Sequence, residues 1–150
     1  MAITGASIIS RAGTILQDTT NVRWPVSELV QWFNDAQREI VLMNPGASVS
    51  TVALDLTAGN TKQSIPDTAL RLIDVVRNLG DGTTYGPAIR LVLREVLDAQ
   101  RPDWHSEAGS ATIKHYIFDP RNPKVFYVYP KPAVVAPATK VSVEVVCSVA

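Results

Sequence analysis

Residues 26–56 read VSELVQWFNDAQREIVLMNPGASVSTVALDL, and the spacing of apolar side chains changes once along this stretch. Up to residue 41, apolar side chains recur every three or four positions, which predicts an amphipathic helix. Asn44-Pro45-Gly46 ends this helix, since proline and glycine are typical of the residues that follow a helix. From residue 48 the apolar side chains alternate, which predicts a half-buried strand.

A second helix is predicted before residue 26. Five apolar side chains there share one helix face: Ile8, Ile9, Ala12, Ile15 and Leu16. Pro25 suits the first turn of the following helix, where its missing N–H removes no hydrogen bond. Residues 1–46 are therefore expected to form an N-terminal helical segment.

Residues 47–150 carry short apolar and β-branched runs that turn residues separate, which predicts a β-rich segment. The expected strands cover residues 51–56, 62–65, 70–78, 88–92, 113–118, 125–129 and 140–149. We expect residues 62–65 to pair with the preceding strand, and residues 113–118 to form a hairpin with residues 125–129. A short helix is expected over residues 93–100.

Helices come first and strands follow, so the predicted fold class is α+β. The expected architecture is an N-terminal helical pair packed with an antiparallel β-sheet or sandwich, with one short helix between strands. The two segments, residues 1–46 and 47–150, are expected to form one domain together.

The composition excludes several classes of function. The 150 residues include 14 Lys and Arg against 14 Asp and Glu, so the formal net charge is zero. Proteins that bind nucleic acid mainly through phosphates show a basic excess. No run of about 18 apolar residues predicts a membrane span, and Met1 begins no visible secretory leader.

The sequence predicts no catalytic, metal or cofactor residues. His105 and His115 lack a third ligand at metal-site spacing. Cys147, the single cysteine, alternates with valines and is expected in the core. Carboxylates stand singly in turns, without the convergent pair that acid–base catalysis needs: Asp67, Asp81, Asp103 and Asp119.

Two alternative functions stay open at this point. The first is a nucleic-acid-binding module, in which the aromatic hairpin stacks on single-stranded bases beside Lys114, Lys124 and Lys131. Its aromatic residues are Tyr116, Phe118, Phe126, Tyr127 and Tyr129. The second is a hydrolytic enzyme with His105 and Asp103 in a loop site.

Presentation of surfaces to other proteins is the function that remains. The polar face of the second helix and the loops at 79–87 and 101–112 offer residue types suited to interfaces. The candidate interface residues are Gln31, Asn34, Asp35, Arg38, Tyr85, Trp104 and His105.

Ordered blocks over roughly residues 5–148 resemble the head-to-tail adaptor proteins of short-tailed bacteriophages, also called connector or tail tubular proteins of the A type. The first block is RWP at 23–25 with ELVQWFNDAQREI at 28–40. The later blocks are KQSIP at 62–66, LIDVVRN at 72–78, LDAQRPDWH at 97–105 and KHYIFDPRNPKVFYVYP at 114–130.

The resemblance implies a structural, non-enzymatic virion protein without a cofactor. Such adaptors form a ring, usually of twelve copies, between the portal of the phage head and a downstream tail or nozzle protein. Double-stranded DNA passes through the ring without sequence-specific binding. The resemblance further implies a place in the virion neck, synthesis in the bacterial cytoplasm and no membrane partner. Related chains often continue beyond a strand like 140–149 into further helices.

Overall fold

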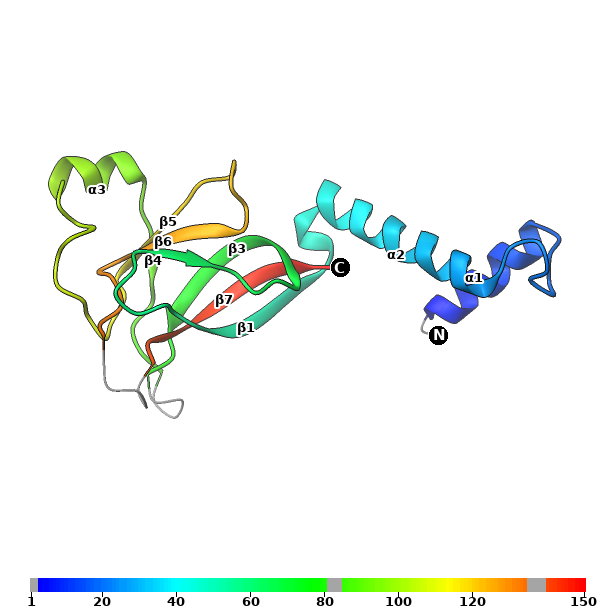
Figure 1. The fold of residues 1–150 in the computed structure, drawn as a ribbon, viewed down its shortest axis with the longest axis horizontal. Coiled ribbons are helices and arrows are strands. Elements are labelled where there is room, and N and C mark those ends of the chain that lie inside the picture. Colours follow the sequence, from blue (N-terminus) through cyan, green and yellow to red (C-terminus); the bar gives the residue numbers. More distant parts are fainter. Residues whose placement is uncertain (1–2, 81–84, 135–139) are drawn as a thin grey trace. The chain divides into compact units, whose positions relative to one another are not determined.

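The computed structural model describes residues 3–80, 85–134 and 140–150, so Asp81 lies outside the described residues (Figure 1). The chain divides into a helical unit, residues 1–44 with Ala150, and a β unit, residues 45–149. The α+β class is confirmed, with a helical pair first and two sheets after it.

The helical unit contains two α-helices, α1 (Gly5–Ile15) and α2 (Val26–Met43). A reciprocal capping box begins α1: the Ser7 amide donates to Thr4 Oγ1 and the Thr4 amide donates to Ser7 Oγ, each at 3.2 Å. Pro25 is the N-cap of α2, in agreement with its predicted place at the start of that helix.

The loop between the two helices is held by one carboxylate. Asp18 accepts hydrogen bonds from the backbone amides of Val22, Arg23 and Trp24 at 2.8–3.0 Å. The bond from Trp24 is the largest cause of a lowered pKa of Asp18, because it stabilises the ionised form. This local network fixes the direction in which the chain enters α2.

The β unit contains two sheets. The three-stranded sheet has the order β1-β7-β3 and the four-stranded sheet has the order β2-β6-β5-β4 (Figure 1). The strands are β1 (Val49–Asp55), β2 (Lys62–Ser64), β3 (Ala69–Asn78), β4 (Arg90–Leu91), β5 (His115–Phe118), β6 (Val125–Tyr129) and β7 (Ser142–Val149). A 3-10 turn, η1 (Pro45–Ala47), precedes them, and the predicted short helix is α3 (Arg94–Gln100).

The main core lies between the two sheets. Leu72 and Val75 of β3 and Val145 of β7 pack with Phe126 and Val128 of β6, and all five are buried. Because the side chains of a strand alternate, the neighbours of these β6 residues point to the other face of the four-stranded sheet. That outer face therefore needs a second covering layer.

The predicted hairpin of β5 and β6 is confirmed, with Ile117 opposite Tyr127. The predicted pairing of residues 62–65 with the preceding strand is wrong. β2 pairs with β6 in the other sheet, while β1 pairs with β7. Burial alternates along β7 as far as Cys147. The strand pairs with β1 and β3 on its two sides, so it is the central strand of the smaller sheet.

The predicted strand at 88–92 is shorter than expected, because this segment crosses from one sheet to the other. The Ile89 amide donates to the Val76 carbonyl of β3 at 3.0 Å, and the next amide, that of Arg90, donates to Lys114 at 3.1 Å. Only Arg90–Leu91 forms the strand β4, which runs parallel to β5.

Candidate functional site

The helical unit buries little of its own apolar surface. Within residues 3–44, the buried residues are Gly13, Leu29 and Val41. An amphipathic helix usually turns its apolar face toward a core, yet ten large apolar side chains of the two helices and their junction are exposed: Ile8, Ile15, Leu16, Val22, Val26, Val30, Trp32, Ile40, Leu42 and Met43. Two helices present too little surface to one another to cover these stripes.

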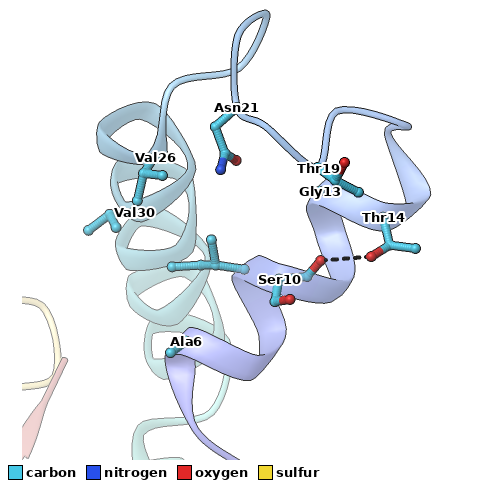
Figure 2. A pocket seen from close by; sticks show the side chains of 9 residues that line it. Ala6, Ser10, Gly13, Thr14, Thr19, Asn21, Val26 and Val30 are labelled. Atoms are coloured by element: carbon cyan, nitrogen blue, oxygen red, sulfur yellow. Dashed lines mark hydrogen bonds between the residues drawn. The ribbon is translucent and has the colours of Figure 1, made fainter.

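A groove of about 520 Å³ lies between α1 and the start of α2. One side of the groove is formed by small residues of α1: Ala6, Ser10, Gly13 and Thr14 (Figure 2). The other side is formed by Val26 and Val30 of α2. Ile9, Thr19 and Asn21 complete the lining, so none of the nine lining residues carries a charge. The groove therefore suits apolar side chains rather than phosphates or carboxylates.

The four interface candidates of α2, Gln31, Asn34, Asp35 and Arg38, are exposed. Arg38 and Asp35 are 3.9 Å apart and both are mostly exposed, so their ion pair contributes little to stability. These polar groups are consequently available to form hydrogen bonds with another protein.

Tyr85, a candidate in the β unit, is 60% exposed. The Arg77 guanidinium lies 3.8 Å from the centre of its ring, and Arg77 also donates to Glu144 at 2.6 Å. This cation–π contact holds the aromatic ring at the surface, in a defined position.

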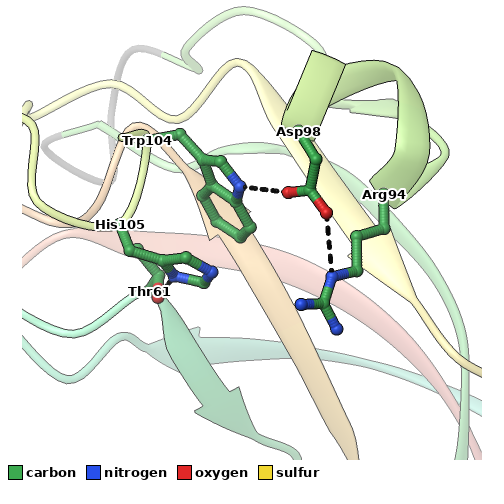
Figure 3. A network of polar contacts seen from close by, with 5 residues as sticks. All are labelled: Thr61, Arg94, Asp98, Trp104 and His105. Carbon is green, nitrogen blue, oxygen red and sulfur yellow. Dashed lines mark hydrogen bonds and ion pairs between the residues drawn. The ribbon is translucent and has the colours of Figure 1, made fainter. Parts of the chain in front are cut away.

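Trp104 does not lie on an exposed loop as expected. It is 1% exposed and packs with Leu97 of α3 and Ile117 of β5, where it covers the outer face of the four-stranded sheet. Its indole N–H donates to Asp98 at 2.8 Å, and Asp98 also accepts from Arg94 at 3.2 Å (Figure 3). Trp104 is therefore a core residue, and the tryptophan ring holds the 101–112 loop in place.

His105 stays exposed, and its ring stacks on Trp104 with 3.6 Å between ring centres. Its Nδ1 is 2.8 Å from the Thr61 hydroxyl (Figure 3). Asp98, the carboxylate of this network, is engaged by Trp104 and Arg94, and the first of these bonds is the main cause of its lowered pKa. The geometry attaches the loop to Thr61, the residue before β2, and gives no support to a hydrolytic pair of His105 and Asp103.

The aromatic hairpin is a poorer stacking platform for bases than its sequence suggests. Tyr116 and Phe126 are buried between the sheets, and Phe118 packs against the same core. Tyr127 and Tyr129 are half-buried and meet Trp104 edge to face. Base stacking needs an open ring face, which the two buried rings do not offer. The nucleic-acid hypothesis therefore loses two of its five aromatic residues.

Cys147 is buried, as the alternation predicted, and burial raises the pKa of its thiol. Among the described residues, no three His, Cys, Asp or Glu side chains lie close enough together to hold a metal ion. None of the described helices is both long and apolar enough to cross a membrane.

The groove of the helical unit was not predicted from the sequence. Ala6, Ser10 and Thr14 follow one another at intervals of four, so they share one face of α1. Side chains this small leave a hollow beside a neighbouring helix. The four-residue spacing of these small residues is the feature of the sequence from which the groove could have been predicted.

A search of curated proteins finds no match to the chain. The family model described as SU10 adaptor protein matches residues 3–150. The match agrees with the resemblance to phage head-to-tail adaptors and extends over both units of the structure. The chain therefore belongs to the SU10 adaptor protein family, and its role is that of a structural phage adaptor.

Proposed function

We propose that twelve copies of this protein form a ring that joins the portal of a phage head to the tail and encloses part of the DNA channel. Membership of the adaptor family supports the structural role. The observation that carries the ring is the exposed apolar surface of the helical unit. Exposed apolar surface on this scale, on one small unit, is typical of protein interfaces.

The small size of the helical unit also supports contacts between copies. A segment of about 40 residues seldom buries enough apolar surface to be stable without a metal, a disulfide or a partner. Residues 1–44 contain neither of the two histidines nor the single cysteine. Contacts with other protein surfaces are therefore the remaining source of stability for this unit.

A ring supplies such contacts in a closed form. In a ring, one patch of each copy meets a different patch of the next copy. Each contact can be modest, because several copies that engage a multivalent portal raise the effective concentration of all of them. The polar groups of α2, together with Tyr85 and His105, are candidates for the contacts with portal and tail proteins.

The charge balance suits a channel that conducts DNA. A ring of neutral chains is itself neutral, since each chain carries 14 basic and 14 acidic residues. A strongly basic lining would bind phosphates and slow the passage of DNA. The assembled ring would lie in the virion neck, and its chains would be made in the bacterial cytoplasm.

Negative-stain imaging of the protein with purified portal tests this proposal. We expect twelvefold rings seated on one end of the portal. A protein that stays monomeric and does not bind the portal would refute the proposal. DNA binding at 50 and 200 mM salt provides a second readout. We expect weak binding at both concentrations, whereas steeply salt-dependent binding would contradict a passive channel.

A further inference from the structure

The two flanks of the helical pair have complementary shapes. α1 and α2 pack through residues such as Gly5 and Phe33, where an added methyl group on Gly5 would lie 3.4 Å from the Phe33 ring. On one side of this contact lies the groove, where Ser10 and Val30 stand on facing helices (Figure 2). We call this side the groove flank.

Large apolar side chains occupy the opposite side. Residues two apart on a helix point to nearly opposite directions, because a turn contains 3.6 residues. Ile8 therefore points away from Ser10, and Trp32 points away from Val30. Ile15, two turns after Ile8, lies on the same side and is 80% exposed. We call Ile8, Ile15 and Trp32 the ridge flank.

The Trp32 side chain of the ridge flank is held in position by neighbouring side chains. The Trp32 ring lies 5.3 Å from the Trp24 ring, centre to centre, and the Arg23 guanidinium lies 5.7 Å from the Trp24 ring. The loop that carries Trp24 is itself held by the Asp18 carboxylate. A fixed aromatic side chain loses little conformational freedom when it enters an interface.

We propose that the ridge flank of one copy seats in the groove flank of the next copy, and that this is the repeated contact of the ring. This inference rests on the proposed ring. The uncharged lining of the groove fits apolar side chains, and the same helical unit displays such side chains on its other side. A contact between two different flanks leaves one groove and one ridge free at the ends of a row, and these meet when the row closes.

Cysteine cross-linking distinguishes this arrangement from others. Cys147 is buried, so the wild-type chain serves as the control without cross-links. In the variants Ser10→Cys and Ile15→Cys, each new thiol stands on one flank. After assembly on portal and treatment with a short bis-maleimide, the double variant should give a ladder of covalent multimers on a denaturing gel. A mixture of the two single variants should give covalent dimers and no higher multimers.

Other outcomes overturn the inference. Covalent dimers from either single variant alone would show that two groove flanks, or two ridge flanks, of neighbouring copies contact each other. If the double variant gives no ladder although imaging shows rings, the ring contact lies elsewhere and the proposed function stands. If no rings form with portal at all, the proposed function fails as well.

A matched pair of substitutions tests the groove directly. Ser10→Leu fills the groove and Ser10→Ala leaves it open, and both residues suit an exposed helix position. We expect Ser10→Leu to reduce the assembled mass to that of a single chain, with Ser10→Ala unchanged and with equal helix content by circular dichroism. Ile15→Lys should have the same effect as Ser10→Leu. Rings of Ser10→Leu that form but no longer hold the portal would mean that the portal occupies the groove, which overturns the proposal.

Discussion

The side-chain amide of Asn78 forms hydrogen bonds with both the amide and the carbonyl of the Ile113 backbone. Asn78 Nδ2 donates to the Ile113 carbonyl and the Ile113 amide donates to Asn78 Oδ1, each at 2.8 Å. Asn78 Nδ2 also donates to Pro87 at 2.9 Å, and all three bonds lie at the end of β3. A single buried side chain thus joins β3 to the segments that enter β4 and β5.

Asn78→Ala should markedly destabilise the β unit. It leaves the buried backbone amide and carbonyl of Ile113 without these partners, at about 1–3 kcal/mol for each unsatisfied group. A lower melting temperature and midpoint of urea denaturation would show this loss. Asn34→Ala, at an exposed position of α2, is the control and should melt within error of the wild type. Equal melting of the two variants would contradict the role given to Asn78.

Truncation of Trp104 should mainly affect folding, whereas truncation of Trp32 should mainly affect assembly. Trp104→Ala removes a buried core residue and should destabilise by about 3–5 kcal/mol. Trp32 is 48% exposed, so Trp32→Ala should have a smaller effect on folding and a larger effect on assembly. Thermal melts and assembled mass, measured on both variants, test this contrast. A Trp104→Ala protein as stable as the wild type would show that Trp104 does not cover the outer face of the four-stranded sheet.

Acid should loosen the loop between α1 and α2. Hydrogen bonds from the amides of Trp24, Val22 and Arg23 lower the pKa of Asp18 in the folded state. The unfolded state therefore binds more protons in this range, and the unfolding free energy falls as the pH drops below about 4. Circular dichroism between pH 6 and pH 2 should show a shallower loss of helix for Asp18→Asn. Identical profiles for Asp18→Asn and the wild type would argue against this linkage.

Charge reversal on the polar face of α2 tests its assignment as a contact. Arg38→Glu should change the melting temperature little, since the side chain is exposed and its ion pair with Asp35 is weak. It should nevertheless weaken assembly or portal binding, which co-sedimentation with portal measures. Unchanged assembly and unchanged binding would remove this face from the contacts.

The local elements could be predicted from the sequence, because each has a clear period or turn signal. The helical stripe of α2 and the alternation of β7 are local patterns that packing did not override. The partners of the strands were harder to predict. β2 pairs with β6, more than 60 residues away, and nothing in its three residues specifies that choice.

The burial of individual side chains was also difficult to predict from the sequence. Apolar periodicity identifies the face that must be covered, but it does not say whether the same chain covers it. Ile15 and Ile40 lie on predicted core faces and are exposed in the structure. Trp104 shows the reverse case, because a loop rich in small residues was expected to be open and instead carries a core side chain. The first error concerns apolar surface that the helical unit does not cover itself, and the second concerns packing between segments that lie apart in the sequence.

The ring is tested most directly by the mass of the protein assembled with purified portal, measured by native mass spectrometry. We expect each portal to gain twelve copies of a 16.3 kDa chain, or about 196 kDa. Loss of this added mass in Ser10→Leu, with Ser10→Ala unaffected, would further place the contact in the groove. A portal that gains no mass, with the protein remaining a monomer of 16.3 kDa, would show that the protein forms no ring on the portal.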